Sequence, residues 1–98
     1  MSDLPRMTLT VFRLEVHFSG RVQGVGFRYL TRQLAQGFAV TGRVRNLPDG
    51  RVHLVVEGTE GEVRAFVGEI QAEMKHYIKE ATEAMLDGSA EFRDFHIG

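Results

Sequence analysis

The sequence predicts one small α+β domain, in which strands and helices follow the order β-α-β-β-α up to about residue 75. Two periodicities predict this order. Apolar and polar residues alternate in the segments 11–18, 38–46 and 51–57, as is typical of half-buried strands. Apolar residues recur at helical spacing over 27–36 and over 62–74. A chain of 98 residues has room for a single core.

The composition excludes several classes of protein. With 43% hydrophobic and 26% charged residues, the chain is an ordinary globular one and not a disordered tail. It has no cysteine, which excludes disulfides, thiolate metal sites and a cysteine nucleophile. Its apolar runs are too short to cross a bilayer, and charges interrupt any signal peptide, so we expect a cytoplasmic protein with no membrane partner. A flexible leader is expected over residues 1–10, and a single domain over 11–98.

The charge is distributed unevenly along the chain. Residues 1–53 carry eight arginines and three acidic residues, whereas residues 54–98 carry ten acidic residues and four basic ones. The net charge of −1 conceals this difference. A basic half in a near-neutral protein favours a small anionic ligand over a long nucleic acid. Chance segregation of solvated surface charges is the alternative.

The first two thirds of the chain contain clear element boundaries. One face of the first predicted strand is apolar and consists of Phe12, Leu14, Val16 and Phe18. Gly37 stands where a glycine commonly follows the end of a helix. Residues 47–50 read Leu-Pro-Asp-Gly, which suits a turn and makes a β-hairpin of the strands on either side.

The last third allows two interpretations. The helical period that begins near residue 62 can be continued to about residue 86, and the Ala, Glu, Lys and Met content favours helix. The other interpretation ends the helix near residue 75, makes 77–85 a strand and places a last strand at 92–97. Economy of the fold favours the second, because a single long helix would force the last strand to return across its whole length. Periodicity alone does not decide between them.

The segment 20–28, GRVQGVGFR, joins the first predicted strand to the first predicted helix. Gly24 and Gly26 permit a tight turn whose backbone N–H groups converge, and such a nest at a helix N-terminus binds anions. It is neither of two familiar phosphate loops. A dinucleotide fingerprint needs a glycine where Tyr29 stands, and a P-loop needs a lysine, which this chain lacks before residue 75. A tight connection that binds nothing is the alternative.

Two side chains favour the anion-binding interpretation of this loop. Arg28 falls in the first helical turn, where a cation opposes the helix dipole, but its planar guanidinium suits two phosphate oxygens. Asn46 ends the second predicted strand, where its amide offers both a donor and an acceptor. The alternatives are a solvated surface arginine and an asparagine that simply starts a turn.

These residues carry a resemblance to a known family. GRVQGVGFR at 20–28, followed by GRVRNLPDGRV at 42–52, resembles the two signature segments of the acylphosphatase family. The resemblance covers roughly residues 12–74, and FRDFHI at 92–97 resembles the last strand of the family. It implies an α+β, ferredoxin-like β-α-β-β-α-β sandwich, with an antiparallel sheet and two helices on one face. On that basis 77–85 is expected to be a strand.

The resemblance also implies an activity and its residues. The expected enzyme is an acylphosphatase, a hydrolase that converts acyl phosphates to a carboxylate and inorganic phosphate without a metal or cofactor. Arg28 is expected to bind the phosphoryl group and Asn46 to orient the attacking water. The general base is unassigned. The phosphate cradle, formed mainly by backbone N–H groups, is expected to comprise Val22, Gln23, Gly24, Val25, Gly26, Phe27 and Arg28.

The expected partners are a small acyl phosphate as substrate and inorganic phosphate as product and inhibitor, with a monomeric protein and no nucleic acid. No metal site is expected, because the four histidines fall on separate elements: His17, His53, His76 and His96. One rival function is a non-catalytic module that binds phosphate or carbamoyl phosphate. Another is an RNA-binding domain, but the aromatic residues of the first strand share the face of Leu14, which indicates core rather than base stacking.

Overall fold

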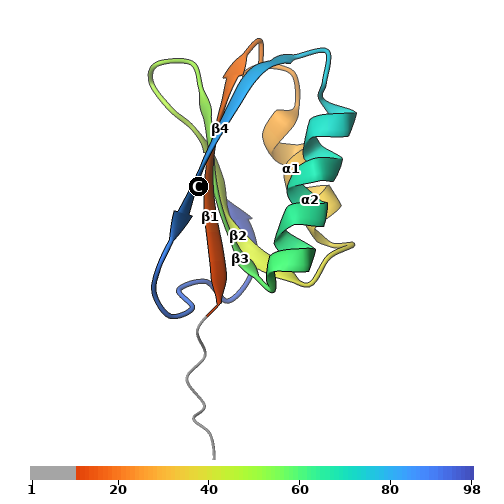
Figure 1. Ribbon diagram of the computed structural model, residues 1–98. Helices are drawn as coiled ribbons and strands as arrows, with labels where there is room; N and C mark the ends of the chain where they lie inside the picture. Colours follow the sequence, from red (N-terminus) through yellow and green to blue (C-terminus); the bar gives the residue numbers. More distant parts are fainter. Residues whose placement is uncertain (1–10) are drawn as a thin grey trace, which may run out of the picture.

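The computed structural model describes residues 11–98, and the predicted leader over 1–10 lies outside this part of the chain. The described residues form two layers, a five-stranded sheet and two helices that cover one of its faces (Figure 1). The elements follow the order β1, α1, β2, β3, α2, β4, β5. The predicted α+β class and the order of elements up to residue 75 are therefore confirmed.

The element boundaries lie within a few residues of the predicted ones. The strands are β1 (Phe12–Gly20), β2 (Val40–Asn46), β3 (Val52–Gly58), β4 (Ile78–Leu86) and β5 (Phe95–Ile97), and the helices are α1 (Phe27–Ala35) and α2 (Glu60–Glu73). Helix α2 begins earlier than its apolar stripe because Thr59 caps it. The Thr59 hydroxyl accepts a hydrogen bond from the backbone N–H of Glu62 at 3.3 Å.

The strand order in the sheet is β4-β1-β3-β2-β5. Strand β1 pairs antiparallel with both β3 and β4, and β2 pairs antiparallel with β3, which is the predicted ferredoxin-like arrangement. Strand β5 differs, because it runs parallel to β2 and makes the sheet mixed. The reason is the path of residues 87–94, which lead the chain from the β4 edge to the opposite edge at the end of the sheet where β2 begins.

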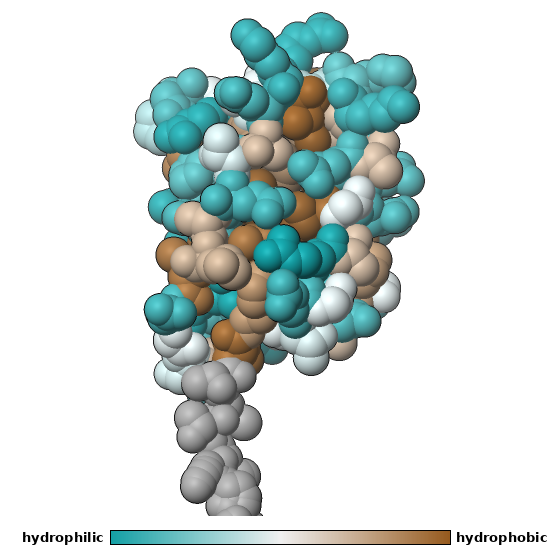
Figure 2. Space-filling view, viewed as in Figure 1, coloured by the Kyte–Doolittle hydropathy of each residue, from teal (hydrophilic) through white to brown (hydrophobic). Residues whose placement is uncertain are grey.

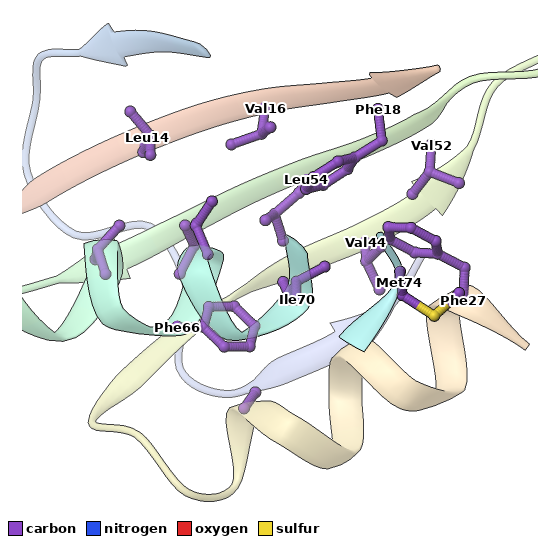
Figure 3. Close-up of a cluster of buried hydrophobic side chains, with 14 of the residues drawn as sticks. Leu14, Val16, Phe18, Phe27, Val44, Val52, Leu54, Phe66, Ile70 and Met74 are labelled. Atoms are coloured by element: carbon purple, nitrogen blue, oxygen red, sulfur yellow. The ribbon is translucent and has the colours of Figure 1, made fainter. Parts of the chain in front are cut away.

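The core lies between the sheet and the helices (Figure 3). Leu14, Val16 and Phe18 of β1 point toward the helices, as the alternation predicts, and each is at most 1% exposed. Phe66 and Ile70 of α2 fill the space opposite them. Burying apolar surface in this way is the main favourable contribution to folding. It also leaves Phe18 covered, so this aromatic ring is not available for stacking on a base.

The last third of the chain follows the strand interpretation. Helix α2 ends at Glu73, and the backbone N–H groups of Tyr77 and Ile78 both donate to the carbonyl of Met74 in the turn that follows. Strand β4 then pairs along β1, which would otherwise present an unpaired edge. Most β4 residues are exposed, so the strand has little apolar alternation to distinguish it from a helix.

A buried ion pair fastens the segment that links β4 to β5. The Arg13 guanidinium donates from Nε to a Glu57 carboxylate oxygen at 2.8 Å, and both side chains are at most 6% exposed. Arg13 also donates to the backbone carbonyls of Asp87, at 3.1 Å, and Ser89. The Glu57 carboxylate accepts from the backbone N–H groups of residues 91 and 92. Both charges are thus compensated by several partners.

The outer surface is largely polar. Figure 2 shows hydrophilic residues over most of the face seen in Figure 1, with hydrophobic residues between them near its middle. Among residues 11–98, no helix combines the length and the apolar character that crossing a membrane requires.

We predict that Glu57→Ala destabilises the fold by about 3–5 kcal/mol, because it leaves the Arg13 charge buried without its partner. Urea denaturation followed by circular dichroism measures this loss in free energy of unfolding. The control is Glu60→Ala, which removes an exposed carboxylate paired with Arg64 at 2.9 Å and is expected to change stability little. Equal effects of the two substitutions would contradict the role given to the buried pair.

Candidate functional site

The loop between β1 and α1 is shaped by two glycines and anchored by apolar side chains. Gly24 and Gly26 have φ angles of 77° and 81°, in the left-handed region that glycine tolerates best. No atom would crowd a Cβ at either position, so the backbone conformation itself favours glycine here. Val22 is fully buried, and the Phe27 ring packs against Phe18 with centroids 5.1 Å apart. The loop is therefore held to the core at both of its ends.

This loop presents a series of backbone donors without internal acceptors. In the described part of the chain, no backbone or side-chain acceptor takes the N–H groups of residues 22–29, and the first bond of this region is donated by Leu30 to Gly26. Gly26 occupies the N-cap of α1 and supplies no side-chain cap, and the first turn holds no acidic residue. Unpaired N–H groups at a helix N-terminus attract anions.

Arg28 lies in the first turn of α1 and is half-buried. Within residues 11–98, no hydrogen bond or ion pair engages its guanidinium, unlike that of Arg13. A cation at this end of a helix is unfavourable unless an anion accompanies it. The surroundings of Arg28 therefore favour a negatively charged ligand.

Asn46 ends β2, in register with the first residue of β3, Val52. Its carboxamide Oδ1 is buried and has no hydrogen-bond partner among the described residues. A buried amide oxygen without a donor costs free energy, and such an atom beside a pocket is typical of a site completed by a ligand or water.

The loop, Arg28 and Asn46 surround one pocket of about 220 Å³. Its lining comprises Val22, Gly24, Gly26, Phe27, Arg28, Tyr29 and Asn46. The sequence predicts all of these except Tyr29, which is 64% exposed. The expected cradle residues Gln23 and Val25 do not line the pocket. Two segments that are well separated in the chain are thus brought together around one concave surface.

The side chain of Gln23 has a part in the site beyond the backbone role that the sequence predicts. Its side-chain amide nitrogen donates to the backbone carbonyls of Leu47 and Arg51, at 2.8 and 2.9 Å. These two bonds tie the loop to the turn between β2 and β3, directly beyond Asn46. The sequence predicts only the backbone role of Gln23, because no local pattern shows which distant carbonyls a glutamine side chain reaches.

The fold and the site define a class: a small ferredoxin-like domain whose pocket is lined by a glycine-rich loop, one guanidinium and one carboxamide. The family model for acylphosphatase matches residues 14–97. An acylphosphatase from Syntrophus aciditrophicus is 43% identical over 86 residues, covering 87% of this chain and 90% of that protein. The chain belongs to the acylphosphatase family.

Other relatives align over shorter segments. An acylphosphatase from Archaeoglobus fulgidus is 46% identical over 59 residues, which cover 60% of this chain and 66% of that protein. Solved structures give the same fold. The acylphosphatase of Bacillus subtilis superposes with a TM-score of 0.80 at 27% identity, over 89% of this chain and 98% of that one. Full-length HypF, in a phosphate- and nucleotide-bound form, matches 95% of this chain with 12% of its own at 26% identity and a TM-score of 0.73.

We predict that Gln23→Ala weakens the binding of inorganic phosphate by about tenfold, because the loop loses its two bonds to the turn and the donors lose their alignment. Isothermal titration with phosphate measures the change. Gln33→Ala, at an exposed position of α1, is the control and is expected to bind like the wild type. Unchanged affinity in the Gln23 variant would show that the loop holds its shape without these bonds.

Proposed function

We propose that this protein hydrolyses acyl phosphates to a carboxylate and inorganic phosphate in the pocket between the 22–28 loop and Asn46. The proposal rests on one pocket that is lined by loop residues, Arg28 and Asn46, whose N–H groups, guanidinium and carboxamide oxygen have no partner among residues 11–98. Membership of the acylphosphatase family supports the same reaction.

The chemistry of the substrate explains why so few groups suffice. The leaving group is a carboxylate whose conjugate acid has a pKa of about 4, so it departs without a general acid. Phosphoryl transfer passes through a loose transition state, with charge spread over the phosphoryl oxygens and the leaving oxygen. Catalysis then depends on positioning and on electrostatic stabilisation. The pocket lining contains no acidic residue that would repel the phosphoryl group.

In this proposal Arg28 and the loop amides bind the phosphoryl group. The guanidinium takes two of its oxygens, and the N–H groups of the loop residues that line the pocket take the others. These donors are fixed by the anchors at Val22 and Phe27 and by the side chain of Gln23, so little reorganisation accompanies the reaction. Preformed donors of this kind stabilise the charge that develops in the transition state.

Asn46 is proposed to hold the attacking water in line with the leaving oxygen. The water oxygen forms the new P–O bond as the bond from phosphorus to the acyl oxygen breaks, and the carboxylate leaves with the electron pair. The water proton passes to a phosphoryl oxygen of the substrate itself, since the pocket lining holds no group suited to act as a base. A side-chain amide suits this role, because it can accept from the water and donate to it.

A second candidate is a module that binds phosphate or carbamoyl phosphate without turnover. The likeness to part of the much longer HypF chain favours it. Turnover distinguishes the two: a binding module would be saturated by phosphate but would release no carboxylate from benzoyl phosphate. A monomeric state, a cytoplasmic location and inhibition by inorganic phosphate belong to the main proposal.

We predict that Arg28→Ala abolishes both turnover of benzoyl phosphate and measurable affinity for inorganic phosphate, because the pocket loses the only cation among the described residues that line it. Arg28→Lys keeps the charge but not the two-pronged geometry, and should retain weak phosphate binding with little activity. Assays in EDTA follow carboxylate release, and titration calorimetry follows phosphate binding. Wild-type kinetics in Arg28→Ala would rule out this site for the reaction.

Asn46→Ala is predicted to reduce kcat by about 10²–10³-fold, because the side chain that orients the attacking water is removed. The inhibition constant of phosphate should stay near that of the wild type, because the groups that bind the phosphoryl oxygens remain. The same EDTA assay, with phosphate as competitive inhibitor, separates the two effects. Parallel loss of turnover and phosphate affinity would instead make Asn46 a phosphate ligand.

A further inference from the structure

The face of the sheet opposite the helices carries a cluster of three metal-binding side chains. His17 of β1 and His53 of β3 are directly opposed in the antiparallel register. Glu15 lies two residues before His17, and therefore on the same face of β1. His17 and His53 do fall on separate elements, as the sequence predicts, but the antiparallel pairing of β1 with β3 places them side by side.

The donor atoms of the cluster are close enough to share one ion. The ligand atoms of Glu15, His17 and His53 all lie within 4.8 Å of one another. His53 Nε2 lies 2.7 Å from a Glu15 carboxylate oxygen, and the two imidazole centroids are 4.7 Å apart. The His53 side chain is only 7% exposed and that of Glu15 is 29% exposed, so one ligand is held firmly while the group stays open to solvent.

We propose that Glu15, His17 and His53 form a binding site for a divalent transition-metal ion of the zinc type. Two imidazole nitrogens and one carboxylate oxygen suit such an ion, with water in the remaining positions. The site lies on the open face of the sheet, whereas Asn46 and the proposed phosphate loop (residues 22–28) lie on the helix-covered side. It is separate from the proposed acyl phosphate chemistry and has no part in it.

Charged groups of both signs lie around the cluster. Burial, and then the nearby His53 and Arg51, lower the pKa of His17 below its usual value. Glu15 contributes negative charge. The other charged groups facing the histidines are Arg45 and Arg51, which oppose a metal, and Asp49, which favours one.

Arg45 modulates the site through His53. Its Nε donates to His53 Nδ1 at 3.4 Å, which leaves the imidazole proton on Nε2, pointing at Glu15. A metal on Nε2 requires that proton to move to Nδ1, where it then faces the Arg45 donor. The arginine must turn away when metal binds, so it weakens the site. Replacing it with an acceptor would remove this conflict and support the ligand, as outer partners of metal-bound histidines do.

The test is titration of the chelator-treated, tag-free protein with Zn²⁺ by calorimetry, and with Co²⁺ by visible absorption, which reports nitrogen and oxygen ligands. We expect saturation at one ion per chain and a raised melting temperature in the presence of Zn²⁺. His17→Ala and Glu15→Gln should each weaken binding by about 10- to 100-fold. His76→Ala, at an exposed position away from the cluster, is the control and should bind like the wild type.

Arg45→Gln should strengthen Zn²⁺ binding by about tenfold, because the glutamine carbonyl can accept from Nδ1–H. A merely structural role for Arg45 would not produce this gain. The proposal is overturned if Zn²⁺ does not bind saturably, or if His17→Ala and Glu15→Gln bind it as the wild type does in protein shown to be folded by circular dichroism. Loss of benzoyl phosphate hydrolysis on metal removal would contradict the separation of the two sites.

Discussion

The register between β1 and β3 is the constraint on which both sites depend. With Phe18 opposite Val52 and His17 opposite His53, one set of side chains faces the helices and the alternate set faces outward. The same pairing brings the end of β1 and the start of β3 to one end of the sheet, where the phosphate loop meets the β2–β3 turn. A shift of one residue in the pairing of β1 with β3 would turn the core side chains outward and would disrupt both the core and the pocket. Burial of the core therefore fixes the geometry of the site.

The phosphate loop shows how local rules are broken where a ligand is expected. Helix α1 starts without a side-chain cap, with unpaired N–H groups and with a cation in its first turn, each of which opposes helix formation in isolation. Other contacts offset the free energy that these features cost: Val22 and Phe27 are buried in the core, and Gln23 makes two hydrogen bonds to the β2–β3 turn. A bound phosphoryl group would satisfy both the donors and the charge, so the same features that weaken the helix favour the ligand.

Local sequence patterns predicted the first three strands and the glycine-rich loop. They did not predict features that depend on contacts between distant segments of the chain. Alternation identified β1, β2 and β3, and the glycine-rich segment with Arg28 and Asn46 identified the residues that meet at the pocket. Strand β4 has good helix formers and few buried residues, so only its pairing with β1 makes it a strand. Two features arise from contacts between distant segments: the side-chain hydrogen bonds of Gln23 and the pairing of His17 with His53. Residue spacing in the sequence gives no sign of either.

Arg51 acts on both sides of this arrangement. Its carbonyl accepts from Gln23 and so helps to hold the phosphate loop, while its guanidinium binds Asp49 at 2.9 Å and, after burial and His53, helps to lower the pKa of His17. The backbone carbonyl makes the hydrogen bond to the loop, so a substitution of the Arg51 side chain leaves that bond in place. The effect on His17 is electrostatic and depends on the side chain. The two faces can therefore vary independently: the pairing of the strands preserves the pocket while the charges on the open face determine what that face binds.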